Sequence, residues 1–212
     1  PWVAAVELPN IINSWFAARG WQVRAHQLAI HDAAAKGRHA LLTAPTGAGK
    51  TLAGFLPTLA DLATNPAEGL HTLYISPLKA LAVDVQRNLI TPIAEMGLNI
   101  RVETRTGDTP AARKARQKEV PPHILLTTPE SLANLLSNPE AAAMMVGVKR
   151  VIIDEVHAFG TTKRGDQCVC TSPAFANQRC KTFRVTHIAG TYANAKCFVG
   201  VGRPNAFQCG SD

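Results

Sequence analysis

Residues 44–51 read Ala-Pro-Thr-Gly-Ala-Gly-Lys-Thr and stand between a short apolar run and a helical pattern. Glycines in such a turn let backbone N–H groups point inward around an anion, and the following helix adds its positive end. Lys50 would supply a charge for the β and γ phosphates, and Thr51 a hydroxyl for Mg²⁺. We predict a site for nucleotide phosphates and Mg²⁺ formed by Thr46, Gly47, Ala48, Gly49, Lys50 and Thr51.

The match to the phosphate-loop pattern G-x-x-x-x-G-K-[ST] has one departure, because Ala44 stands where the first glycine is expected. The alternative is a chance glycine turn before a helix. The order of the remaining residues, between a predicted strand and a predicted helix, favours phosphate binding.

Residues 154–157 read Asp-Glu-Val-His and follow an apolar stretch that predicts a buried strand. An acidic pair at such a strand end costs free energy unless a metal ion or a donor meets it. Asp154 is expected to hold Mg²⁺ through water, and Glu155 to orient and deprotonate the attacking water. His157 would sense the γ-phosphate or contact a second domain. Alone, this tetrapeptide could be a surface turn; with the phosphate loop upstream, it predicts nucleoside triphosphate hydrolysis.

The predicted catalytic residues are Lys50, Asp154, Glu155 and His157, and the predicted metal ligands are Thr51 and Asp154.

The elements that position these residues alternate between helix and strand up to residue 155. Apolar spacing predicts helices over 8–19, 24–36, 50–63, 79–96, 110–118 and 129–136, and strands over 39–43, 72–76, 100–104, 124–127 and 148–153. This alternation predicts an α/β domain with a mainly parallel sheet flanked by helices. Ligand sites in such folds lie at the carboxyl ends of the strands, where both motifs fall.

Composition narrows the class further. Hydrophobic residues make up 46% of the 212 residues and charged residues 17%, which indicates a globular chain. No apolar run approaches the roughly 18–20 residues of a membrane span, and no signal peptide is apparent, so we expect a cytoplasmic protein without a membrane partner. The net charge of +7 agrees with a nucleic-acid partner, although much of it comes from the C-terminal part.

Residues 168–212 differ in composition from the rest. They hold all five cysteines, and five Lys and Arg residues against one Asp. The cysteine spacing matches no zinc site, and their odd number does not favour a closed disulfide set. No helix or strand period is visible there. We predict a domain over 1–167 and an atypical tail over 168–212, and we hypothesise that the tail is frameshifted or poorly ordered.

Several further segments resemble motifs of superfamily 2 helicases. Residues 76–81 (Ser-Pro-Leu-Lys-Ala-Leu) resemble motif Ia, residues 105–109 (Arg-Thr-Gly-Asp-Thr) a backbone-contacting segment, and residues 127–132 (Thr-Thr-Pro-Glu-Ser-Leu) motif Ib. The stretch from Trp15 to Gln27 is similar to the Q-motif region. Together with Asp-Glu-Val-His-Ala and the later Lys163-Arg164-Gly165, the set is most similar to Lhr-like helicases. Within these it looks closest to the bacterial ligase-associated DExH-box helicases. The resemblance covers about residues 8–167.

This resemblance implies the first RecA-like domain of a P-loop motor that binds ATP and Mg²⁺. Gln27 would read the adenine edge, and Arg24 is counted with it among the cofactor-binding residues. The family implies a 3′-to-5′ ATP-dependent translocase on DNA, with RNA or hybrids as alternatives, in repair beside a DNA ligase and a nuclease. The expected nucleic-acid contacts are Pro77, Lys79, Arg105, Thr106, Gly107, Thr128, Pro129, Glu130 and Lys163.

The family continues into a second RecA-like domain with an arginine finger, which this sequence does not contain. We therefore expect a truncated motor with very slow ATP hydrolysis and no unwinding, since arginine fingers contribute about 10³–10⁵ in rate. The alternative from the binding class is a fragment that holds ATP and single-stranded nucleic acid without performing work. A P-loop small-molecule kinase is a third possibility, but the motifs at 127–132 and 154–157 would have no role in it.

Overall fold

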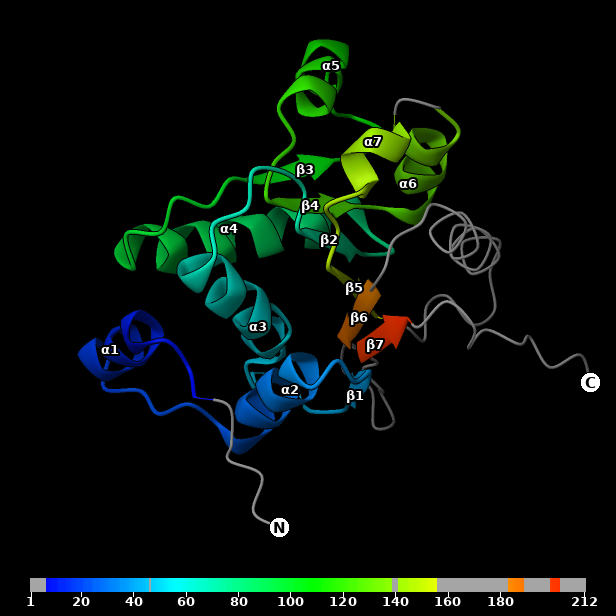
Figure 1. The fold of residues 1–212 in the computed structure, drawn as a ribbon. Coiled ribbons are helices and arrows are strands. Elements are labelled where there is room, and N and C mark those ends of the chain that lie inside the picture. The colour runs from blue at the N-terminus through cyan, green and yellow to red at the C-terminus, as the bar shows by residue number, and fades with distance from the viewer. Residues whose placement is uncertain (1–6, 46, 139–140, 156–182, 189–198, 203–212) are drawn as a thin grey trace, which may run out of the picture.

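The computed structural model describes residues 7–45, 47–138, 141–155, 183–188 and 199–202. Within these ranges helices and strands alternate as the apolar pattern predicts (Figure 1). The helices are α1 Asn10–Ala18, α2 Ala25–Ala35, α3 Lys50–Thr64, α4 Lys79–Glu95, α5 Ala111–Glu119, α6 Pro129–Leu136 and α7 Ala141–Met145. The strands are β1 Ala40–Leu42, β2 Thr72–Ile75, β3 Val102–Arg105, β4 Ile124–Thr127, β5 Arg150–Asp154, β6 Phe183–Ile188 and β7 Val199–Gly202.

The strands form one sheet in the order β1-β6-β5-β2-β4-β3, and β7 pairs with β6. Every pairing along this path is parallel, and the β6–β7 pairing is antiparallel. The carboxyl ends of the six parallel strands therefore share one edge of the sheet, which we call the carboxyl edge. The predicted α/β fold with a mainly parallel sheet is confirmed.

Helices cover both faces of this sheet, because its central strands are apolar on both sides. Tyr74, Leu126 and Ile152 point to one face and join a core that includes residues of α1, α2, α3 and α4. Leu73, Leu125 and Val151 alternate to the other face and pack with α6 and α7. Figure 1 shows these two groups of helices on opposite sides of the strands. The result is a three-layer domain.

The predicted helices and strands up to residue 155 agree with the observed ones to within two residues at either end. Three elements were not predicted, namely α7, β6 and β7. The expectation that residues 168–212 lack strand structure is wrong for β6 and β7, since β6 lies between β1 and β5 in the sheet. β6 reads Phe-Arg-Val-Thr-His-Ile, with polar residues where strands inside a parallel sheet are usually apolar, so its sequence did not predict a strand. The boundary at residue 167 stays a prediction.

Across the described part of the chain, the helices are too short or too polar to cross a bilayer.

Candidate functional site: the carboxyl edge of the sheet

The phosphate loop joins β1 to α3 at the carboxyl edge. Gly47 and Gly49 have φ of 78° and 74°, the left-handed region that glycine adopts without a Cβ clash. Gly49 also precedes α3 directly, so the N-terminus of this helix opens onto the loop. The Nζ atom of Lys50 donates to the carbonyl oxygen of Ala44 at 2.8 Å, which holds the ammonium across the loop. Thr46 lies outside the described residues.

Two residues of the Q-motif region support this loop from α2. The guanidinium of Arg24 donates to the carbonyl of Gly47 at 3.2 Å, and the Gln27 side-chain amide donates to the carbonyl of Gly49 at 3.5 Å. Gln27 is buried, and its amide oxygen accepts the backbone N–H of Arg24 at 2.9 Å. A Cβ on Gly49 would lie 3.1 Å from the Gln27 amide nitrogen, so the packing here also favours glycine. Contact of Gln27 and Arg24 with adenine stays a prediction; support of the loop is their observed role.

Asp154 ends β5 at the same edge and is buried. Its Oδ2 atom accepts the hydroxyl of Tyr74, and its Oδ1 atom accepts the backbone N–H of Glu155 at 2.9 Å. Burial raises the pKa of the Asp154 carboxyl to about 7, and the nearby Glu155 carboxylate raises it as well. The Lys50 ammonium lowers the same pKa, so the charge of the phosphate loop acts on this carboxyl. Because β6 lies between β1 and β5, the phosphate loop and Asp154 lie on the same edge of the sheet, one on each side of β6.

Glu155 follows with φ of 52°, a conformation that residues other than glycine seldom adopt. Such backbone strain persists only where surrounding structure maintains it, and it concentrates at functional sites. His157 lies outside the described residues.

The segments predicted to contact nucleic acid follow β2, β4 and β3, which are adjacent strands. The backbone N–H of Ser76 donates to the carbonyl of Thr127 at 3.0 Å. The hydroxyl of Thr127 in turn donates to the carbonyl of Arg105 at 2.7 Å. These bonds join the three segments into one surface at the carboxyl edge. Asp154 on β5 adjoins it, and β6 lies between β5 and the strand that precedes the phosphate loop.

Lys79 is the exposed cation of this surface. Its Nζ atom lies 2.8 Å from each carboxylate oxygen of Asp108, so the motif Ia segment and the Arg-Thr-Gly-Asp-Thr segment meet through this ion pair. A Cβ on Gly107 would lie 3.4 Å from the same Nζ atom. Lys79 and Gly107 thus lie together where a phosphate could approach.

Other residues of the predicted nucleic-acid set point inward. The guanidinium of Arg105 is buried and donates to the Lys114 carbonyl at 2.9 Å and to Gln117 Oε1 at 3.2 Å, on α5. Burial lowers the pKa of Arg105. The Thr128 hydroxyl begins α6 by accepting the N–H of Ser131 at 3.4 Å. Thr106, Pro77 and Pro129 are also buried, and Glu130 is half-buried. Lys163 lies outside the described residues. A contact with nucleic acid through the inward residues stays a prediction.

Sequence reasoning did not identify Tyr74 or Asp108 as members of the site. Asp108 was within a quoted motif, and its charge beside an expected phosphate path was a usable signal. Tyr74 gave no such signal, because its hydroxyl meets Asp154 eighty residues later in the chain. Only the β2–β5 register brings the two together.

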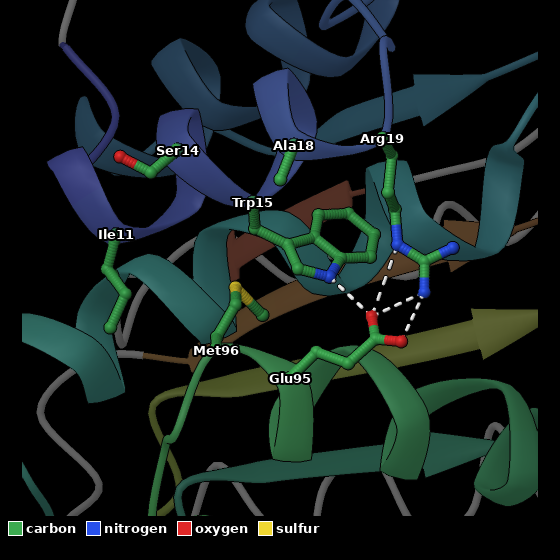
Figure 2. A pocket seen from close by; sticks show the side chains of 7 residues that line it. All are labelled: Ile11, Ser14, Trp15, Ala18, Arg19, Glu95 and Met96. Atoms are coloured by element: carbon green, nitrogen blue, oxygen red, sulfur yellow. Dashed lines mark hydrogen bonds and ion pairs between the residues drawn. The ribbon is translucent and has the colours of Figure 1, made fainter.

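A pocket of about 500 Å³ lies elsewhere, between α1 and the end of α4. Figure 2 shows the Glu95 carboxylate in it, facing Trp15 and Arg19. The indole N–H of Trp15 donates to Glu95 Oε2 at 2.7 Å, and Arg19 also binds this carboxylate. Because α4 begins at the carboxyl edge and returns toward the other end of the strands, this pocket is separate from the phosphate loop. The ion pair attaches α1 to the domain, and it lowers the pKa of Glu95.

A parallel sheet with a phosphate loop after its first strand and an acidic pair at the end of β5 defines a RecA-like nucleotide-binding domain. The DEAD/DEAH box helicase family model matches residues 24–185, and the chain belongs to this family. Within superfamily 2 it is Lhr-like.

The Lhr helicase/probable uracil glycosylase of Mycolicibacterium smegmatis is 43% identical over 168 residues, which cover 73% of this chain and 11% of that protein. The Lhr helicase/uracil glycosylase of Escherichia coli K12 is 42% identical over 181 residues, covering 74% and 12%. The solved structure of Mycobacterium smegmatis helicase Lhr bound to ssDNA and AMP-PNP has a TM-score of 0.77 and 35% identity, and the match covers 87% of this chain and 24% of that one. The chain thus spans about a tenth of the length of these two curated relatives. Closeness to the ligase-associated subgroup stays a prediction.

Proposed function

We propose that this chain is the ATP-binding half of a motor that moves along DNA, the first RecA-like domain of an ATP-dependent helicase or translocase. The observation that carries the proposal is the sheet order β1-β6-β5, which places the phosphate loop after β1 and Asp154 at the end of β5 on the same edge, with β6 between them. A P-loop lysine facing a strand-end acid is the arrangement that binds and hydrolyses a nucleoside triphosphate. The relative solved with AMP-PNP and ssDNA supports both ligands.

The residues at the site fit a magnesium ion. Burial and the neighbouring Glu155 carboxylate both raise the pKa of Asp154, so a positive charge beside it would favour the ionised form. A divalent cation would supply that charge, with Thr51 in the first turn of α3 as the hydroxyl ligand. Bound there, Mg²⁺ would neutralise the phosphate oxygens. Lys50 would leave the Ala44 carbonyl for the β and γ phosphates, and Glu155 would take the proton of the attacking water.

Nucleic acid would lie along the neighbouring part of the same edge. The segments after β2, β4 and β3 are joined by one backbone hydrogen bond and one from the Thr127 hydroxyl, and they present Lys79 and Gly107 to solvent. Recognition through small loops and a few cations suits a motor that must ignore base sequence. Movement would require a second RecA-like domain to close over the ATP. DNA is the proposed strand, and a ligase or nuclease partner stays a prediction of the family resemblance.

Equilibrium binding tests this proposal directly. The 212-residue chain should bind a fluorescent ATP analogue in Mg²⁺, and Lys50→Ala should weaken binding at least tenfold because the phosphate charge loses its counterion. Labelled single-stranded DNA should bind as well, and a matched RNA strand is the comparison. Absence of Mg–nucleotide binding by the unchanged, folded chain would refute the motor assignment. ATP turnover with and without DNA then separates a working motor from the alternative, a fragment that binds both ligands and performs no work.

A further inference from the structure

Tyr74 is a polar group in the most buried part of the sheet. It lies in β2 with no exposed surface, and a phenol hydroxyl at such a depth requires a hydrogen-bond partner. In the β2–β5 register Tyr74 stands opposite Ile152, so Asp154 is two residues further along β5 and on the same face. The Tyr74 hydroxyl reaches along that face and donates to Asp154 Oδ2.

The Tyr74 ring is also in contact with the helix that follows the phosphate loop. Phe55 of α3 packs against it, with ring centroids 5.5 Å apart and planes inclined by 32°. Phe55 follows Lys50 by little more than one helical turn. One side chain therefore contacts the phosphate-loop helix through its ring and the strand-end acid through its hydroxyl.

A carboxylate rotates broadly about its last torsion unless hydrogen bonds fix it. Asp154 receives one donor on each oxygen, the Tyr74 hydroxyl on Oδ2 and the Glu155 N–H on Oδ1. Each oxygen keeps a lone pair for a further ligand. Together the two hydrogen bonds fix the rotation of the carboxylate, so its free lone pairs have one orientation before any nucleotide binds.

We infer that Tyr74 is a positioning residue, whose hydroxyl sets the orientation of the Asp154 carboxylate for the magnesium ion that accompanies ATP. The inference rests on the proposed function. Partners that orient a metal ligand contribute to metal affinity without touching the metal, and their loss commonly weakens it about 10–100-fold. Tyr74 acts on the metal and not on the triphosphate, so its effect should appear only when Mg²⁺ is present.

The test measures how much Mg²⁺ improves nucleotide binding. The dissociation constant of ATP is determined for the 212-residue chain in excess Mg²⁺ and again in EDTA, for the unchanged chain and for Tyr74→Phe. Phe retains the ring and its contact with Phe55 and removes only the hydroxyl. We expect the ratio of the two constants to fall about tenfold in Tyr74→Phe, while the constant in EDTA stays unchanged.

Thr72→Val is the matched control. Thr72 lies on the same strand and face, and its buried hydroxyl bonds to Thr58 and His71, away from Asp154. This variant also loses a buried hydroxyl, so it should be destabilised in denaturant yet keep the full benefit of Mg²⁺. Equal losses in the two variants would reduce Tyr74 to a structural role and overturn the inference.

A double-mutant cycle supplies a second measurement. In an Asp154→Asn background, Tyr74→Phe should cause no further loss of the Mg²⁺ benefit, because the carboxylate that it orients is gone. Additive losses would overturn the inference. If Mg²⁺ does not improve nucleotide binding by the unchanged chain, both the proposed function and the role of Tyr74 are wrong. If Mg²⁺ improves binding equally for the unchanged chain and for Tyr74→Phe, the proposed function stands and the role of Tyr74 is wrong.

Discussion

Strands β2 and β5 carry a polar cluster at each end, and the two clusters differ in how their charges are met. At the amino end, the fully buried guanidinium of Arg150 donates to Thr58 Oγ1 at 2.9 Å and to Asp61 Oδ2 at 3.0 Å. The hydroxyls of Thr58 and Thr72 lie 3.0 Å apart, and His71 Nδ1 lies 2.9 Å from Thr72 Oγ1. We call this set of five residues the amino-end cluster. Within this cluster the Arg150 cation is paired with the Asp61 anion.

At the carboxyl end the buried carboxyl group has no such ion-pair partner among the residues that the structure describes. Asp154 has hydrogen-bond donors, but burial and the Glu155 carboxylate still raise its pKa to about 7 despite Lys50. A cluster whose charges cancel internally contributes to stability, whereas a cluster that needs an external cation is suited to binding one. We therefore assign the amino-end cluster to stability and the carboxyl end to ligand binding, as a hypothesis that the variants below test.

The largest expected effect is on the amino-end cluster. Arg150→Met keeps much of the side-chain volume and removes the charge that α3 and β5 share through Asp61 and Thr58. Removing one partner of a buried ion pair is strongly destabilising, but Asp61 is 39% exposed and can be hydrated, so we expect a loss of about 3 kcal/mol. Denaturant unfolding measures it. A loss below about 1 kcal/mol, or loss of Mg–ATP affinity in still-folded protein, would contradict the division of roles.

Acid should weaken the same cluster. Burial and the nearby Arg150 charge lower the pKa of His71 to about 4. The unfolded chain, with an ordinary histidine pKa near 6.5, therefore binds more protons than the folded chain between these two values. Stability from neutral His71 is present above pH 6.5 and is lost as the pH falls toward 4. We expect about 1.5 kcal/mol of unfolding free energy to be lost between pH 6.5 and pH 5 on this account.

His71→Asn isolates that contribution. The variant starts from a lower stability. Between pH 6.5 and pH 5 its unfolding free energy should fall by about 1.5 kcal/mol less than that of the unchanged chain. Buried His31 and His123 also have lowered pKa values, so some acid dependence will remain. Parallel curves for the variant and the unchanged chain would show that His71 is not the residue that titrates.

The comparison of the two clusters also separates what sequence can predict from what it cannot. Helices and strands follow local periodicity, and parallel topology places strand ends on one edge, so the placement of the phosphate loop and Asp154 on the same edge was predictable. The hydrogen bond from Tyr74 to Asp154 depends on register between distant strands. Arg105 reads as an exposed phosphate contact, yet its guanidinium turns inward to α5, because a side chain at a strand end can point to either side of the edge.

The smallest effect on stability, and a sharp one on function, is expected at Lys79. Lys79 and Asp108 form an exposed ion pair, and such pairs contribute less than about 1 kcal/mol. Lys79→Ala should therefore leave unfolding nearly unchanged while it weakens binding of single-stranded DNA. If Lys79 meets one phosphate, the slope of log affinity against log salt should also fall by about one.

Asp108→Asn is the matched variant, since it removes the competing carboxylate and leaves the ammonium available. DNA affinity should then rise where Lys79→Ala lowers it, and effects of the same sign in both variants would show that the pair acts on the loop and not on the phosphate.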